Sequence, residues 1–225
     1  MENPQGKSNE HETACARIAA HFSRPALRHY VRSKLRSDPV YQAVYKILHG
    51  SNNSLFDIGC GVGLLAFYLR ERNCSQPIIS IDIDARKIER AKTVAAASYL
   101  NVEFRGHAAE QIPANFSGDI VLLDLLHYLP LEEQKSLLKS LATRVAPGGH
   151  LIIRDSPRDR TARYWITFLA EKFAQAISWN WKAPLHFPSE PELNEPFDES
   201  EFERTSRSLW GQTPFNNHIF IFRRR

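Results

Sequence analysis

The chain has 225 residues, of which 43% are hydrophobic and 24% are charged, and its formal net charge is +4. This composition predicts one globular domain with a full core. No apolar run is long enough to cross a bilayer and residues 1–12 lack the apolar core of a signal peptide, so we expect a soluble, cytoplasmic protein without a transmembrane segment. The three cysteines lack CxxC spacing, which argues against a disulfide framework or a zinc site.

The first dozen residues are polar, and we expect them to be disordered. Between residues 13 and 37, apolar side chains recur at one-turn intervals, with Pro25 as a break between two helices. Asp38 and Pro39 suit the start of another helix, and Gly50 suits its end. Residues 13–53 are therefore predicted to form a helical N-terminal segment.

Basic residues dominate part of this segment. No acid lies between Thr13 and Ser37, whereas six basic residues do: Arg17, Arg24, Arg28, Arg32, Lys34 and Arg36. Two interpretations stay open, a solvated helix face and a docking surface for an acidic partner such as a carrier protein, a phosphate-bearing substrate or a membrane surface. No recognised nucleic-acid-binding motif accompanies the charge, so we expect no nucleic-acid partner.

Residues 55–69, LFDIGCGVGLLAFYL, predict a strand, a tight turn and a helix. Glycine has no Cβ, so glycines at alternate positions 59, 61 and 63 let a ligand approach the backbone closely. The dinucleotide-binding pattern GxGxxG would need glycine at position 64, where Leu64 stands. The alternative is that the glycines only form a turn in another α/β protein.

Strands and helices then alternate, which predicts a parallel sheet covered on both faces. The expected strands are residues 77–83, 101–105 and 118–130, followed by a tight turn and a further strand within 147–155. The expected helices are 84–97, 130–143 and 161–178. Residues 179–202 read as an irregular cap with at most one helix near 198–202, and the last residues read as two strands joined by a turn at 213–217.

Four motifs between residues 54 and 155 resemble those of the class I methyltransferases that use S-adenosyl-L-methionine (SAM). They include the acid-x-Gly-x-Gly-x-Gly phrase from Asp57 and the Pro-Gly-Gly phrase from Pro147. The resemblance implies an α/β fold with a Rossmann-like, seven-stranded, mostly parallel sheet whose last strand is antiparallel. It also implies helices on both faces, an N-terminal helical lid at 13–53, and a SAM-binding core at 54–225 with a cap insertion at 179–202.

Ligands of open parallel sheets bind at the carboxyl ends of the strands. Asp82 lies nineteen positions beyond Gly63, where an acid accepts hydrogen bonds from ribose hydroxyls. The resemblance implies that SAM contacts Asp57, Gly59, Cys60, Gly61, Gly63, Asp82, Ile83, His107, Ala108, Asp124 and Leu125. His107 departs from the family, because many members have an acid there that binds the adenine amino group. Glu110 is the alternative for that contact.

Methyl transfer needs an acceptor with a free lone pair, and a phenol with a pKa of about 10 benefits from a neighbouring base. His127 is the first candidate for the base, and its alternative role is to cap or stiffen its loop. Tyr30 is a second catalytic candidate, which together with His29 would line the lid. The expected substrate-binding residues are His29, Tyr128, Arg154, Asp155, Trp210 and Asn216. No acidic cluster has metal-ligand spacing, so we expect no metal.

The fourth strand lacks the Pro-Pro-aromatic phrase of amino-group methyltransferases, and no Pro-Cys nucleophile is present, which leaves a small molecule, free or tethered. The phrases RSDPVY, LLDLLHYL, LIIRDSPRD and LWGQTPFNN resemble those of bacterial methyltransferases encoded with aryl polyene or xanthomonadin-type pigment pathways. That resemblance implies a hydroxyaryl acceptor of bacterial secondary metabolism, free or on an acyl carrier protein that docks on the basic helices. The alternatives are a non-catalytic SAM-binding module and a nicotinamide-dependent oxidoreductase.

Overall fold

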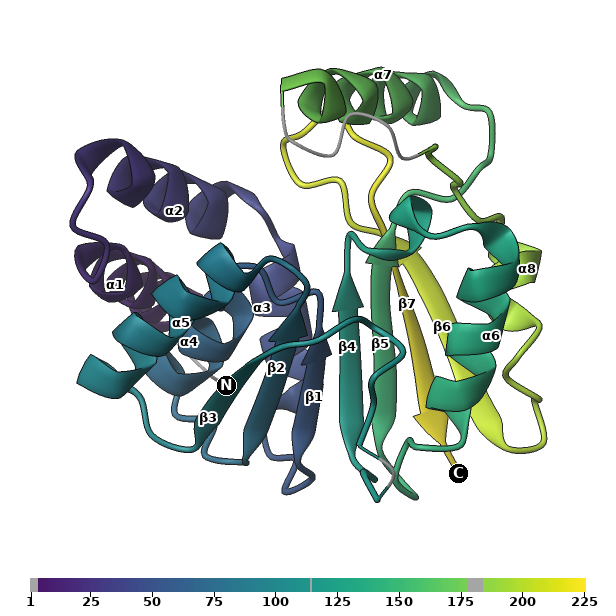
Figure 1. The fold of residues 1–225 in the computed structure, drawn as a ribbon, viewed down its shortest axis with the longest axis horizontal. Helices are drawn as coiled ribbons and strands as arrows, with labels where there is room; N and C mark the ends of the chain where they lie inside the picture. Colours follow the sequence, from purple (N-terminus) through teal and green to yellow (C-terminus); the bar gives the residue numbers. More distant parts are fainter. Residues whose placement is uncertain (1–3, 114, 178–183) are drawn as a thin grey trace. The chain divides into compact units, whose positions relative to one another are not determined.

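A computed structural model of the chain describes residues 4–113, 115–177 and 184–225. The chain forms two compact units, residues 1–111 and 112–225, in which helices flank the strands (Figure 1). The seven described strands give the predicted Rossmann-like, mixed sheet, in which β7 is antiparallel. No helix of the described residues is long and apolar enough to span a membrane.

The first unit contains three parallel strands, with β2 paired to both of the others. In it, α1 packs against α2 and α4, and α5 packs against β2 and β3. Its elements are α1 Pro4–Ala20, α2 Pro25–Ser37, α3 Val40–Leu48, β1 Leu55–Ile58, α4 Leu64–Glu71, β2 Ile78–Asp82, α5 Ala85–Ser98 and β3 Val102–Gly106. The predicted break at Pro25 and the cap at Asp84 are both confirmed.

The disorder expected for residues 1–12 is wrong from Pro4 onward, because this stretch begins α1. His11 is buried, and its Nδ1 lies 2.8 Å from the hydroxyl of Tyr68 on α4. Arg72, the residue that follows α4, donates from its guanidinium to the Glu10 carboxylate at 2.9 Å. These tertiary contacts order a polar segment whose composition alone predicts no structure.

Gly63 makes the close approach between α4 and β3 possible. It adopts a φ of +82° at the start of α4, and a Cβ at this position would lie 2.6 Å from Cζ of Phe104. Phe104 is a buried residue of β3. The glycine is therefore required both by backbone conformation and by packing.

Replacing Gly63 with alanine should lower the free energy of unfolding by about 3 kcal/mol, because the methyl group meets Phe104 and the backbone is strained. Gly50 is the matched control, because its φ is +88° and a Cβ there meets no atom within 4 Å. Gly50→Ala should cost only about 1 kcal/mol. Urea denaturation measures both values, and equal losses would contradict the packing argument.

The second unit contains parallel strands β4 and β5, and β7 pairs antiparallel with both β5 and β6. Helix α7 lies beyond the carboxyl ends of β4 and β5 (Figure 1). The elements are β4 Asp119–Leu123, a 3-10 helix Leu126–Tyr128, α6 Leu131–Ala142, β5 His150–Asp155, α7 Ala162–Ile177, α8 Glu190–Asn194, β6 Phe202–Ser208 and β7 His218–Arg224.

Two expectations for the second unit are corrected, and part of a third lies outside the described residues. The strand predicted at 118–130 ends at Leu123, because Asp124 adopts a φ of +55° and the chain turns into the 3-10 helix. The helix predicted near 198–202 lies instead at Glu190–Asn194, where Ser189 and Glu192 form a capping box. Of the predicted cap, residues 179–183 lie outside the described residues.

Helix α7 is only partly packed. Tyr164 and Thr167 are buried, whereas Trp165, Leu169 and Phe173 are exposed. Ser178, the last residue of the predicted helix, lies outside the described residues. Helical periodicity identified the element, but it did not distinguish a core-facing side from an exposed apolar side.

Candidate functional site

The glycine loop lies at the carboxyl end of β1, in the first unit. Gly59, Gly61 and Gly63 all have positive φ angles. The backbone N–H groups of Gly59 and Cys60 both donate to the Ile81 carbonyl, at 2.8 and 2.9 Å, and tie the loop to β2. A Cβ on Gly61 would meet no atom within 4 Å, so the backbone here borders open space that a ligand can enter.

Asp82 ends β2 and holds the glycine loop in place. Its Oδ2 accepts a hydrogen bond from the Gly61 N–H at 2.8 Å, and its Oδ1 accepts one from the Asp84 N–H at 2.8 Å. Each carboxylate oxygen has a second lone pair, so the half-buried Asp82 can also accept hydrogen bonds from ligand hydroxyls. The next side chain, Ile83, is 75% exposed and offers an apolar surface beside it.

Asp57 is buried on β1, with the Ser80 hydroxyl donating to its Oδ2 at 3.4 Å. Burial raises the pKa of the Asp57 carboxyl to about 7, against the Ser80 hydrogen bond and with support from the charge of Asp82. Burial also raises the pKa of the Cys60 thiol, as do the charges of Asp57 and Asp82. Cys60 therefore stays a thiol at neutral pH, which argues against a nucleophilic role.

The loop after β3 contains the predicted adenine contacts. The His107 N–H donates to the Arg105 carbonyl at 3.1 Å, and the Ala108 N–H donates to Oε1 of Gln111 at 2.8 Å. The His107 side chain is half-buried, whereas Glu110 is exposed. The adenine contact of His107 stays a prediction, and Gln111 is a loop-ordering residue that the sequence analysis did not identify.

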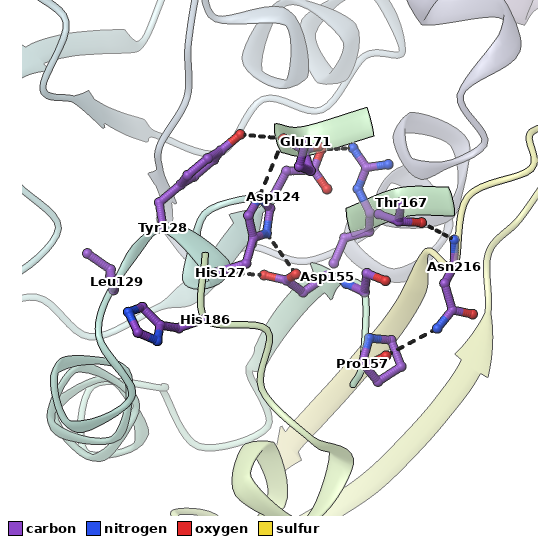
Figure 2. A network of polar contacts seen from close by, with 12 residues as sticks. Asp124, His127, Tyr128, Leu129, Asp155, Pro157, Thr167, Glu171, His186 and Asn216 are labelled. Carbon is purple, nitrogen blue, oxygen red and sulfur yellow. Dashed lines mark hydrogen bonds and ion pairs between the residues drawn. The ribbon is translucent and has the colours of Figure 1, made fainter. Parts of the chain in front are cut away.

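In the second unit, His127 and Asp155 form a buried pair (Figure 2). Their side chains are 4% and 0% exposed, and Nδ1 of His127 lies 2.8 Å from Oδ1 of Asp155. The His127 N–H also donates to Oδ2 of Asp155 at 3.3 Å. Burial lowers the pKa of His127, but the charge and hydrogen bond of Asp155 and the charges of Asp124 and Glu171 outweigh it and raise the pKa to about 9. The imidazole is therefore protonated at neutral pH.

Glu171 of α7 faces this pair from the other side (Figure 2). Its Oε2 accepts a hydrogen bond from the Tyr128 hydroxyl at 2.7 Å and lies 4.0 Å from Nε2 of His127. Burial and the charge of Glu171 raise the pKa of the Tyr128 phenol, which keeps it a donor. The sequence analysis missed Glu171. The available signal was that Glu171 is the one acid within the 16 residues of α7.

The chain around residue 187 covers His127. Phe187 stacks on the imidazole at a centroid distance of 4.9 Å and an angle of 14°. The His186 N–H donates to the His127 carbonyl at 2.8 Å, and the Gln134 amide donates to the carbonyls of Leu129 and His186. These contacts fix the orientation of the ring.

Arg154 is buried on β5 and donates to the Asp124 carboxylate. Asp124 is partly exposed, with its left-handed backbone at the end of β4, and the adjacent Leu125 is half-buried. The predicted site residues Asp124 and Arg154 thus both lie at the carboxyl ends of β4 and β5. Arg154 is engaged with the protein's own carboxylate.

Other predicted site residues have different surroundings. Asn216 is buried and bound within the protein: its N–H donates to Oγ1 of Thr167 at 2.8 Å, and its Nδ2 donates to the Pro157 carbonyl at 3.2 Å (Figure 2). It ties the loop before β7 to α7. Trp210 is partly exposed, with the Arg163 guanidinium 4.4 Å from its ring centroid. His29 and Tyr30 are exposed on α2 of the first unit.

Within the described parts of the chain, no group of His, Cys, Asp and Glu side chains could hold a metal ion.

Comparison with known proteins gives consistent matches. Residues 55–149 match the family model described as a methyltransferase domain. The chain is 28% identical over 134 residues to the ribosomal protein L11 methyltransferase of Shewanella pealeana, covering 58% of this chain and 44% of that protein. It is also 28% identical over 116 residues to the ubiquinone biosynthesis O-methyltransferase of Idiomarina loihiensis, covering 50% and 45%. The chain thus matches less than half the length of these relatives.

A similar solved structure is the magnesium protoporphyrin IX methyltransferase of Synechocystis with bound SAM. The TM-score is 0.63 at 15% identity, and the match covers 95% of this chain and 90% of that one. This similarity confirms the fold over nearly the whole chain.

Proposed function

We propose that this chain, which has the class I SAM-dependent methyltransferase fold and a methyltransferase domain at residues 55–149, transfers a methyl group from SAM to a hydroxyl group of a small acceptor. The observation that supports this most directly is the open backbone at Gly61 beside the Asp82 carboxylate. A sulfonium and an α-amino group both favour nearby carboxylates, and ribose hydroxyls are donors to carboxylate oxygens.

The residues around the glycine loop fit SAM. Asp82 would accept hydrogen bonds from the ribose hydroxyls, Asp57 would face the amino acid end, and the glycine loop would lie under it. The exposed Ile83 and the loop of His107 and Ala108 would contact the adenine. When bound, SAM supplies a methyl carbon activated by a positively charged sulfur.

The proposed acceptor is a hydroxyaryl group, free or carrier-bound, of bacterial secondary metabolism. The name of the Idiomarina loihiensis relative supports oxygen as the methylated atom. Aromatic side chains in the second unit support an aryl acceptor, because Phe168 lies one helical turn before Glu171 and its ring centroid is 6.2 Å from that of Phe187. The sequence resemblance to the pigment-pathway group supports the same class.

An acidic acyl carrier protein is the proposed partner. Arg24, at the N-cap of α2, and Arg28 and Arg32 within the helix recur at four-residue intervals, and all three are exposed. Of the remaining basic residues there, Arg36 pairs with Glu12 and Lys34 with Asp38. The exposed arginines therefore give α2 a positive stripe, which complements an acidic carrier.

Calorimetry with SAM and with NAD, followed by assays with labelled methyl-SAM, tests the proposal. We expect SAM to bind and NAD not to bind, and we expect label to enter phenolic acceptors such as methyl 4-hydroxybenzoate or its carrier-linked thioester counterpart. Tight NAD binding would favour an oxidoreductase. SAM binding without transfer to any free or carrier-linked phenol would favour a non-catalytic SAM-binding module.

The carrier proposal needs a separate comparison. The double variant R24S/R32S spares Arg28, whose Nε also donates to the Phe22 carbonyl. It should lower transfer to the carrier-linked phenol about tenfold and leave transfer to the free phenol unchanged. The matched control is K135S/K139S on α6, which removes the same charge elsewhere. Equal effects of the two double variants would contradict docking on α2.

A further inference from the structure

Strand β3 is an edge strand of the first unit (Figure 1). Among the strands of the described residues, it pairs with β2 alone. In a parallel pair, alternate residues of a strand bond to the neighbouring strand, and the Ile78 N–H donates to the Asn101 carbonyl at 3.0 Å. The main-chain groups of Val102, Phe104 and Gly106 therefore point away from β2, toward the free edge. Such an edge can pair with another strand.

An open groove with a volume of about 980 Å³ follows this edge. It is lined by all five residues of β3 and by the end of α5, where alanines 95–97 and Ser98 have small side chains that let another chain approach closely. Leu100 also lines the groove and is 84% exposed, the highest value among the large hydrophobic side chains of the described residues. A partner bound at the edge would cover this apolar side chain.

The charges on β3 complement those of a second copy. Glu103 and Arg105 lie on the opposite face of the strand from the buried Phe104, because side chains alternate along a strand. Within one chain, Nε and Nη2 of Arg105 donate to the two carboxylate oxygens of Glu103, both at 2.7 Å. In an antiparallel pair centred on Phe104, Glu103 of each copy lies opposite Arg105 of the other, on the same face. Four charges of alternating sign then form a closed ring.

We infer that two copies of this chain dimerise by antiparallel pairing of their β3 strands, centred on Phe104. The same register satisfies the main chain, because Phe104 faces Phe104 of the second copy and Val102 faces Gly106. The residues whose N–H and C=O groups point outward thus bond to one another. The contact is isologous and involves the first unit alone, and pairing closes this edge to further strands.

Sedimentation velocity of the full chain tests the pairing, because the dimer has twice the mass of the 25.8 kDa chain. E103R puts an arginine opposite Arg105, and R105E puts a glutamate opposite Glu103. Each variant alone should raise the dimer dissociation constant at least about 30-fold. An equimolar mixture of the two variants should form a heterodimer at least as tight as the wild-type dimer, because both cross-strand pairs again have opposite charges.

Two further variants serve as controls. The double reversal E103R/R105E keeps both opposite-charge pairs, so it should dimerise as the wild type does and shows that position 103 and position 105 tolerate the new side chains. E203R reverses an exposed acid on β6 that pairs with Arg223 at 3.7 Å, and it should leave the dimer unchanged. A dimer that E203R abolishes and E103R does not would overturn the inference, because its contact would lie on β6.

Amide exchange followed by NMR reports on the strand itself. The Phe104 N–H points to the free edge, so it should exchange at least about tenfold more slowly in the wild-type dimer than in R105E. The Glu103 N–H faces β2 in both proteins and serves as the internal reference. Equal protection of the Phe104 N–H in the two proteins would contradict pairing at β3.

The remaining outcomes are also decisive. A wild type that stays monomeric up to about 1 mM would overturn the inference and leave the edge to an extended segment of another protein. Single variants that dimerise as tightly as the wild type would overturn it, as would a mixture of E103R and R105E that forms no heterodimer. None of these results decides methyl transfer, which is measured separately.

Discussion

Replacing Asp82 with alanine should weaken SAM binding about 100-fold, which corresponds to about 3 kcal/mol. Two losses contribute. The ribose hydroxyls lose a charged acceptor, and the N–H groups of Gly61 and Asp84 lose the carboxylate that holds the glycine loop against β2. Isothermal titration calorimetry with SAM measures the change.

Asp84→Ala is the matched control, because Asp84 is two residues away and has a purely local role. Its side chain accepts a hydrogen bond from the Arg86 N–H at the start of α5. Loss of this cap should cost about 1 kcal/mol of stability and leave SAM affinity within about threefold of wild type. If D82A binds SAM as tightly as D84A does, Asp82 is not a cofactor ligand.

Local sequence signals predicted the first unit well. The apolar run before Asp57, the alternating glycines and the acid at position 82 define β1, the loop and the end of β2, and the structure confirms each element. These features depend on neighbours in sequence or on fixed strand spacing. The sequence could not show that Asp82 also binds the Gly61 N–H, because that contact depends on the pairing of two strands.

The second unit was predicted less completely, because its site depends on how distant segments pack. The helix containing Glu171 was expected, but nothing local indicates that α7 crosses near the end of β4 and brings Glu171 to Tyr128. Asn216 looked like a substrate ligand from its loop position, and the structure shows it bonded to Thr167 and Pro157. The capping box at Ser189 was readable from the sequence and was missed.

Asp155→Asn should remove much of the alkaline pH dependence of stability that His127 contributes. The folded-state pKa of His127 is raised from 6.5 to about 9, so its contribution is fully present below about pH 6.5 and is lost as the pH rises through 9. Between about pH 7.5 and about pH 9.5 the wild type should lose about 2 kcal/mol from this group. Without the charge and hydrogen bond of Asp155, only the charges of Asp124 and Glu171 oppose the effect of burial, so the pKa of His127 should fall and this loss of stability should shrink.

The same variant should also be less stable at about pH 7.5, by about 3 kcal/mol, because the protonated His127 loses its buried partner and the Ser156 N–H loses a charged acceptor. Asp119→Asn is the control: Asp119 is an equally buried acid of the same unit whose Oδ1 accepts from the His150 N–H at 2.7 Å. It should also lower stability, but the pH dependence should persist, because the pair of His127 and Asp155 is intact. Urea unfolding at the two pH values measures both effects. A D155N protein that loses as much stability as the wild type over this range would show that His127 is not held protonated by Asp155.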